Sequence, residues 1–267
     1  MVPIIGQGRW DRDAIAYFAR VQADGGVIVS DMDVNNAIKH AKQHGYWSSV
    51  AFWTSAQFGV KKDGANAVSK LYCLKGNDAA QTTGSAQPTW TANQQNGRAT
   101  LAFANLDYLD VALSEAWGTT EGYALVSAYL NTGTSHYGAL RASSTALDDL
   151  WSGYWRFNNN GNGFFDTFRS ARYDNYPTGM PVLGSKIFTV VSGTGTGSYF
   201  VTINGVNQGY LDPLFGIDIS TIKLGRDSVG NFFPNSRINE VLLANSSFDD
   251  TIRTAIESFQ NQKWAIY

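Results

Sequence analysis

Hydrophobic and polar residues alternate with the two-residue period of β-strands along much of the chain after Gly97. The clearest segments are 186–191 and 199–203, which are separated by a stretch containing three glycines. Asn204-Gly205 follows, and an Asn-Gly pair favours the positive φ angles of a tight hairpin turn. The sequence therefore predicts a β-hairpin here, and it predicts further strands at 98–103, 108–111, 123–129, 153–157, 222–225 and 237–244.

The pattern before Gly76 has a helical period instead. In residues 13–22, Ile15, Phe18 and Val21 fall on one stripe of a predicted helix. A second helix is expected to follow Ser30 and to stop at Gly45, with an apolar side formed by Val34, Ala37, Ile38 and Ala41. Two more short helical pieces are expected at 46–53 and 65–74.

A change of composition near Gly76 divides the chain. Residues 77–96 are rich in Thr, Gln, Ala and Asn, which predicts a connector that runs over the surface. The expected organisation is a helical docking unit at 1–76, this connector, and a β-sandwich at 97–267.

Composition and charge limit the partners. Charged residues make up 16% of the chain, below the usual share of about a quarter. The formal net charge of −2 provides no basic field, so we expect no nucleic-acid partner. No apolar run approaches the roughly 20 residues that cross a bilayer, and residues 1–6 lack the features of a secretory signal. We therefore expect the chain to be made in the host cytoplasm. We expect no membrane insertion.

Four motifs follow one another toward the C-terminus. They are Asn204-Gly205, the strand Ser236-Arg-Ile-Asn-Glu-Val241, a helix at 251–260 with a capping box of Ser247 and Asp250, and Lys263-Trp264. This order resembles the end of laminin-G-like, concanavalin A-like jelly rolls. The resemblance implies a mainly β protein with a small α N-terminal unit, folded as an antiparallel β-sandwich jelly roll.

A second resemblance concerns the N-terminal unit. Ala16-Tyr-Phe-Ala-Arg-Val21, then Gly25-Gly26, then Gly45-Tyr-Trp-Ser48, is similar to the helical segment at the front of many tailed-phage virion proteins. The resemblance implies a virion location and docking on other virion proteins or on copies of the same chain as a homo-oligomer. The candidate docking residues are Trp10, Tyr17 and Trp47.

The acidic residues do not have the spacing of a glycan hydrolase. Concanavalin A-like glucanases carry E-x-D-x-x-E on one strand, which places alternate carboxylates on one face. The nearest groupings here have other spacings: Asp107 with Asp110, Glu115 with Glu121, and Asp148-Asp149. His136 has no nucleophile motif nearby. We therefore expect no enzymatic activity and no catalytic residues, with glycan hydrolysis kept as an alternative because distant carboxylates can converge in a fold.

The sequence contains two candidate metal sites. His40 and His44 lie one helical turn apart, but Ala41 stands where a zincin carries its glutamate, so a solvated helix end is preferred. Asp166 and Asp174 lie in a segment that resembles the calcium loop of legume lectins, from which it departs at Phe164 and Ser170. We expect no cofactor, with calcium at Asp166 and Asp174 as the alternative. Cys73, the only cysteine, is expected to be a small buried side chain.

A sugar site requires aromatic faces and amides, because a pyranose offers an apolar face and a rim of hydroxyls. One segment offers both, and its candidates are Trp151, Tyr154, Trp155, Asn158, Asn160 and Asn162. Alternation on a strand places Trp151 and Trp155 on one face and Tyr154 on the other, so core packing competes with binding for these rings.

The hypothesis from sequence is a non-enzymatic phage virion protein of decoration, fibre or adhesin type. Its helical unit docks on the particle and its lectin-like sandwich faces outward. The first alternative is a receptor protein that binds host-surface glycan, and the second is a glycan hydrolase.

Overall fold

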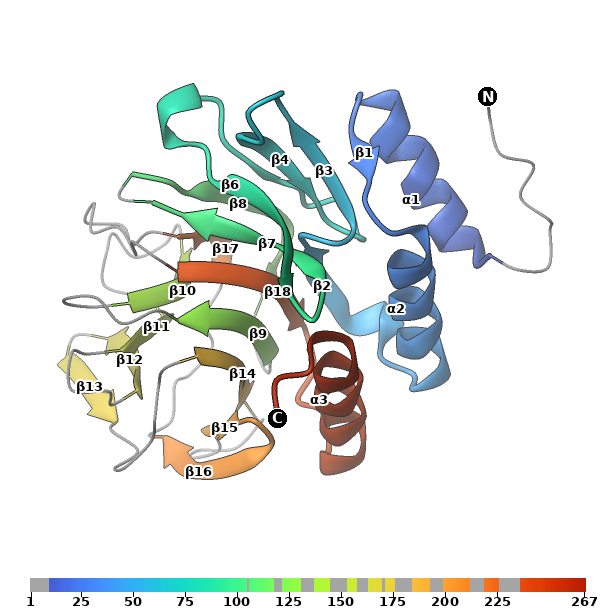
Figure 1. Cartoon of the computed structure of the whole chain (residues 1–267). Coiled ribbons are helices and arrows are strands. Elements are labelled where there is room, and N and C mark those ends of the chain that lie inside the picture. The colour runs from blue at the N-terminus through green and yellow to red at the C-terminus, as the bar shows by residue number, and fades with distance from the viewer. Residues whose placement is uncertain are drawn as a thin grey trace.

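The computed structural model describes residues 10–104, 106–117, 122–130, 137–144, 153–157, 163–169, 171–175, 184–192, 199–211, 219–225 and 236–267. Of these, only the backbone is described at 116–117, 126, 128–130, 137–175, 184–186, 188, 190–192, 199–201, 207–211, 219 and 236. Two antiparallel sheets lie against each other, and the helices lie along one side of them (Figure 1). This architecture confirms the predicted β-sandwich with a small helical component. None of the described helices is long and apolar enough to cross a membrane.

The first sheet has the order β1-β3-β4-β5-β8-β17-β10-β11-β12-β13. In that order its strands are Val27–Ile28, Gly59–Lys62, Val68–Tyr72, Ala79–Ala80, Leu109–Trp117, Ile219–Leu224, Tyr137–Ser144, Gly153–Phe157, Gly163–Arg169 and Ala171–Asn175.

The second sheet has the order β16-β15-β14-β9-β18-β7-β6, and β2 also pairs with β18. In that order its strands are Val206–Leu211, Tyr199–Ile203, Gly184–Ser192, Gly122–Leu130, Ser236–Ala244, Arg98–Phe103 and Thr89–Gln95, and β2 is Val50–Ser55. The helices are α1 Arg12–Ala23, α2 Asp31–Gln43 and α3 Asp250–Trp264, with short 3₁₀ turns η1 Trp47–Ser49 and η2 Gly84–Ala86.

The core of the sandwich lies between the two sheets. Alternate residues of β8 and β17 point into it from the first sheet, and those of β7 and β18 point into it from the second. They are Leu109, Val111, Ile222, Leu224, Leu101, Phe103, Ile238, Val241 and Leu243, each at most 2% exposed. The two-residue period that predicted these strands therefore reflects the alternation of inward-facing and outward-facing side chains.

Strand β18 changes its neighbour halfway along. One edge pairs with β9 throughout, whereas the other pairs with β7 at 236–238 and with β2 at 240–244. A register shift falls between Ile238 and Glu240, at the point where the neighbour changes. Asn239 thus marks a β-bulge, a feature that redirects side chains and ends pairing.

The helices form another apolar cluster against the sheets. Helix α1 packs on β1 and β3 of the first sheet, whereas α2 and α3 share the cluster with Trp53, Leu125 and Leu242 of the second sheet. Val34, Ala37, Ile38 and Ala41 of α2 are fully buried, as the helical period predicted. On α1 the prediction was wrong for Ile15, which is 40% exposed, because Ala14 and Tyr17 turn inward with Phe18 and Val21.

Side chains cap the first turn of each helix. The Ser30 hydroxyl accepts from the Asp33 amide at 3.2 Å, and the Asp11 carboxylate accepts from the Asp13 amide at 2.9 Å. For α3 the predicted capping box was wrong, because Asp249 is the N-cap and accepts from the Ile252 amide at 2.9 Å.

Two segments before Gly76 that were predicted as helices are strands. Residues 46–53 form η1 and the start of β2, and residues 65–74 contain β4. The predicted connector at 77–96 also contributes β5 and β6. Because β4 pairs with β5 and β2 pairs with β18, both sheets continue across the boundary drawn at Gly76.

The hairpin predicted at Asn204-Gly205 is confirmed. Both residues have positive φ, 51° and 77°, and Ile203 pairs with Val206. A second Asn-Gly turn at Asn96 and Gly97 joins β6 to β7, with φ angles of 50° and 70°. The sequence signal for this second turn is the same Asn-Gly pair, at the end of the segment predicted as a connector.

Gly225 ends β17 against a buried ring, and it provides a test of the packing. A Cβ there would lie 2.1 Å from Phe103 Cδ1 and 2.9 Å from the Asp107 carbonyl oxygen, at a φ of +86°. Gly225→Ala should lower the free energy of unfolding by about 2–4 kcal/mol in denaturant titration. Gly84→Ala is the control, because a Cβ there meets nothing within 4 Å. Equal stabilities of the two variants would contradict this packing.

Candidate functional site

The most concentrated group of buried polar side chains in the described chain surrounds Glu240. This residue follows the bulge of β18, points toward the helices and is fully buried. Its Oε1 accepts from Trp53 Nε1 at 2.6 Å and from Gln260 Nε2 at 2.7 Å. Its Oε2 accepts from Lys263 Nζ at 2.7 Å and from Trp264 Nε1 at 3.1 Å. Each carboxylate oxygen thus binds two donors.

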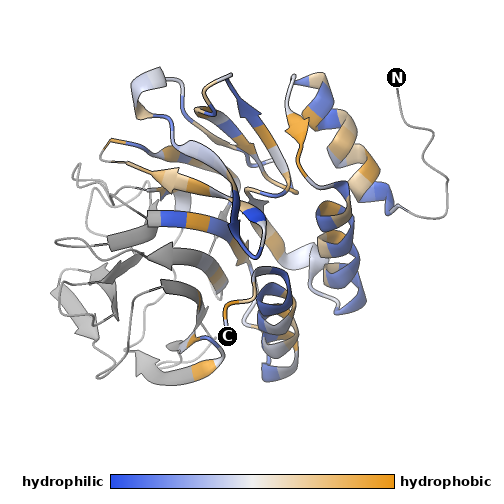
Figure 2. Cartoon of the chain, in the orientation of Figure 1, coloured by the Kyte–Doolittle hydropathy of each residue, from blue (hydrophilic) through white to orange (hydrophobic). Residues whose placement is uncertain are grey.

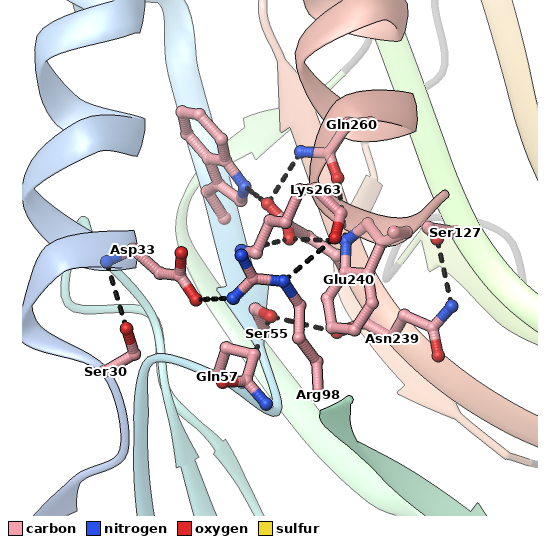
Figure 3. Close-up of polar contacts among 12 residues, drawn as sticks. Ser30, Asp33, Ser55, Gln57, Arg98, Ser127, Asn239, Glu240, Gln260 and Lys263 are labelled. Carbon is pink, nitrogen blue, oxygen red and sulfur yellow. Dashed lines mark hydrogen bonds and ion pairs between the residues drawn. The ribbon is translucent and has the colours of Figure 1, made fainter. Parts of the chain in front are cut away.

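The helical period of α3 brings three of these donors together. Gln260, Lys263 and Trp264 stand three and four residues apart, so they share the face that packs on the sheet. Figure 3 shows Gln260 and Lys263 pointing from α3 toward Glu240. The hydropathy colouring in Figure 2 shows α3 to be largely hydrophilic, which agrees with a helix held partly by polar contacts.

Lys263 is the cationic partner in this site. Its side chain is 5% exposed, and its Nζ lies 4.4 Å from the centre of the Phe58 ring and 5.2 Å from that of Trp264. Removal of an ammonium and a carboxylate from water costs several kcal/mol for each ion. The ion pair, the two indole N–H groups and the rings around Nζ offset this cost together.

A second layer of polar contacts ties the end of α3 to the start of α2. The Lys263 carbonyl accepts from Arg98 Nε at 2.9 Å and from Asn96 Nδ2 at 3.0 Å. The Arg98 guanidinium also forms an ion pair with Asp33, in the first turn of α2 (Figure 3). A cation at the C-terminus of α3 and a carboxylate in the first turn of α2 both interact favourably with the helix dipoles.

Buried amides and hydroxyls continue this polar region along β18. Asn239 Nδ2 donates to the Ser127 hydroxyl at 3.1 Å, and the Ser55 hydroxyl donates to the Asn239 carbonyl at 3.0 Å. On the other side of Glu240, burial raises the pKa of the Tyr46 phenol, and the charge of Glu240 raises it further. Tyr46 is therefore neutral at physiological pH.

The arrangement limits what Glu240 can do chemically. A carboxylate offers about four lone-pair sites, and all four of its contacts here are donors from the protein itself. A general base requires a lone pair within reach of a substrate proton. The site therefore has the chemistry of a structural hub that joins β2, β18 and α3.

The candidate sugar residues fall in the first sheet or outside the described residues. Trp151, Asn158, Asn160 and Asn162 lie outside them, whereas the backbone of Tyr154 and Trp155 belongs to β11. The Cα of Tyr154 pairs with that of Asp166 on β12, and Asp166 pairs with Asp174 on β13. The sugar candidate and both calcium candidates therefore occupy one cross-strand row, with neighbouring positions about 5 Å apart.

The same row continues into a part of the sheet whose side chains are described. Tyr154 pairs with Arg141, Arg141 with Lys223, and Lys223 with Asp110. Asp110 is exposed and forms an ion pair with Lys223. The adjacent positions Val111 and Ile222 are buried in the core, so this row belongs to the outer face of the sheet. The position of Trp155, one residue along, belongs to the opposite face.

Of the three docking candidates, Trp10 and Trp47 are half-buried and Tyr17 is buried. Tyr17 is 2% exposed and donates a hydrogen bond to the Tyr72 carbonyl at 3.2 Å, so its assignment to a docking surface is corrected to the core. Trp10 meets the Phe18 ring edge to face at 5.7 Å. Trp47 Nε1 donates to Asp13 at 2.9 Å, and Lys75 Nζ lies 4.3 Å from its ring centre.

The remaining candidates have local partners. Cys73 is buried as predicted, burial raises the pKa of its thiol, and its Sγ accepts from the Trp53 and Lys75 amides. The rings of His40 and His44 lie 4.4 Å apart. Among the described residues, no group of three or more His, Cys, Asp or Glu side chains could hold a metal ion.

Sequence reasoning missed Glu240 as a site residue. Its signal was a single acidic residue in the strand at 237–244, which is otherwise apolar from Val241 to Ala244. A charge at such a position requires a buried partner, and Arg253 and Lys263 were the cations available in the C-terminal helix. The sequence contained both residues, but not the contact between them.

No protein-family model matches the sequence, and no curated protein matches it. Among solved structures, the sialidase of Trypanosoma rangeli in complex with sialic acid is similar, with a TM-score of 0.57 and 12% identity over 80% of this chain and 33% of the sialidase. A phenylalanine-to-alanine mutant of HCR/D has a TM-score of 0.57 and 13% identity over 79% of this chain and 52% of that protein. The chain spans about a third and about half of these proteins. At such identities the likeness concerns the fold, and it agrees with the β-sandwich.

The Glu240 site predicts a large cost for removal of its charge. Glu240→Gln leaves Lys263 buried without a counterion, which should lower the free energy of unfolding by about 3–5 kcal/mol in denaturant titration. Glu115→Gln, at an exposed position of β8, should change it by less than about 0.5 kcal/mol. A cost below about 1 kcal/mol for Glu240→Gln would contradict the role of the ion pair.

Proposed function

We propose that this chain is a non-enzymatic phage virion protein that docks through its N-terminal helices and displays a lectin-like β-sandwich. The observation that carries the proposal is the internal saturation of Glu240, the buried acid with the most polar contacts in the described chain. With its lone pairs occupied by donors of the chain itself, this buried acid stabilises the fold and is not placed to act on a ligand. The pattern of residues 16–48 supports the virion context.

The arrangement of the helices suits docking on one side and display on the other. The helices lie along one side of the two sheets (Figure 1). Exposed Asp110, Ala112 and Ser114 belong to β8 on the outer face of the first sheet. Trp10 and Trp47 remain as docking candidates, because each ring is half-buried and has an exposed part.

The alternative function is binding of a host-surface glycan. It is favoured by the cross-strand row in which Tyr154 lies beside Asp166 and Arg141. An aromatic position flanked by charged positions has the composition of a sugar site. One similar structure is a sialidase with sialic acid bound, so sialylated glycans are the first ligands to try. Hydrolysis remains the second alternative.

The virion role is tested on particles of the phage that encodes the chain. Immunogold labelling with antibodies against the sandwich should mark intact particles at a fixed position. Mass spectrometry of purified particles should find the chain in a constant ratio to the major capsid protein. Absence of the chain from purified, infectious particles would overturn the proposal. Release of reducing ends from polysaccharides by the purified protein would replace it with the hydrolase.

The glycan alternative predicts a specific loss in one variant. If the row binds sugar, Tyr154→Ala should weaken binding on a glycan array at least about tenfold, because loss of one ring contact costs about 1.4 kcal/mol or more. Tyr267→Ala is the matched control, since Tyr267 is 54% exposed at the end of the chain. Unchanged thermal unfolding in both variants excludes a folding defect. Equal binding by Tyr154→Ala and the unmodified protein would exclude this row as the site.

A further inference from the structure

A histidine of α2 lies at the contact with α3. The His40 ring stacks on the Phe259 ring, with centroids 4.4 Å apart and an interplanar angle of 23°. Both side chains are half-buried. Phe259 immediately precedes Gln260, which binds Glu240, so the histidine contact and the buried hub are neighbours on α3.

A hydrogen bond fixes the orientation of the same imidazole. His40 Nδ1 lies 2.8 Å from the hydroxyl of Tyr46, a fully buried residue whose phenol is neutral. In the tautomer that carries its proton on Nε2, the neutral imidazole accepts this hydrogen bond at Nδ1. A protonated imidazole has two donors, so the Tyr46 hydroxyl would have to become the acceptor and direct its hydrogen elsewhere. Protonation of His40 thus disturbs a contact inside the core.

Within the described part of the chain, the groups that contact His40 carry no negative charge. On α2 its neighbour is His44, with ring centroids 4.4 Å apart, and α3 contributes the uncharged ring of Phe259. Glu240 acts on the buried phenol of Tyr46, and its own hydrogen bonds go to donors of β2 and α3 and not to the imidazole. Burial, and then the charge of His44, lower the pKa of His40 from its ordinary 6.5 to about 4. A cation over the phenyl ring is weakly favourable, but these two effects outweigh it.

We propose that the His40–Phe259 contact is an acid-sensitive latch, which holds α3 against α2 when the imidazole is neutral and loosens when it is protonated. The folded state resists a proton that the unfolded or detached state accepts near pH 6.5. Stability is therefore unaffected above about pH 7 and falls as the pH decreases from 6.5 toward 4. The latch does not require the proposed virion function.

The experiment measures the folding equilibrium and the hydrogen exchange of α3 amides between pH 7.5 and pH 4. Each proton taken up on unfolding changes the folding equilibrium constant up to tenfold per pH unit. His40→Gln keeps an acceptor for Tyr46 but cannot titrate, so its equilibrium constant should fall less steeply below pH 6.5 than that of the unmodified protein. In the unmodified protein, amides 256–260 should lose protection before those of β18.

His44→Gln is the matched control on the same helix. It leaves His40 in place but removes a positive neighbour, so the folded-state pKa of His40 should rise, and the loss of stability below pH 6.5 should persist but end at a higher pH. Titration of His40 by NMR in the unmodified protein requires no variant and reports its pKa directly. A folded-state pKa at or above 6.5, or identical pH profiles for His40→Gln and the unmodified protein, would overturn the latch.

Discussion

The packing of the second sheet and α3 depends on one buried carboxylate. Glu240 receives donors from Trp53 on β2 and from Gln260, Lys263 and Trp264 on α3. Its position follows from the bulge at Asn239, where β18 exchanges β7 for β2. The geometry is restrictive, because the buried N–H donors of Trp53, Gln260 and Lys263 would lose this acceptor if β2, β18 and α3 moved apart. Apolar burial draws α3 to the sheet, and this site determines how the helix sits on it.

The fold could be predicted best where one face of a strand meets the core and the other meets solvent or a polar layer. Strands β7 and β18 show this and appeared at nearly their observed bounds, as did β11, β14 and β15. Strand β2 could not be recognised in this way, because five of its six residues are buried and the alternation disappears. On α1 the error came from Ile15, whose apolar side chain lies on the exposed side of the helix. In both cases the observed burial depends on which other elements cover the segment, and the intrinsic helix or strand propensity of its residues does not report this.

The site was harder to predict than the fold, because its residues meet through tertiary contacts. Trp53 and Glu240 are 187 positions apart, and no spacing rule connects them. The row of Tyr154, Asp166 and Asp174 depends on the register of the β11–β12 and β12–β13 pairs. The sequence of the turn at 158–162 did not predict that register. By contrast, the proximity of His40 and His44 follows from helical geometry alone. Local periodicity therefore anticipated contacts within an element and missed those between elements.

The exchange of neighbours along β18 has a consequence for synthesis of the chain. Strand β2 leaves the ribosome early, and the strand that covers its edge is among the last segments to be made. Until then β2 has a largely apolar surface and an open edge, which favours premature association with other chains. Formation of so distant a pairing is also slow. Nascent copies of this protein should therefore depend on chaperone protection until translation has finished.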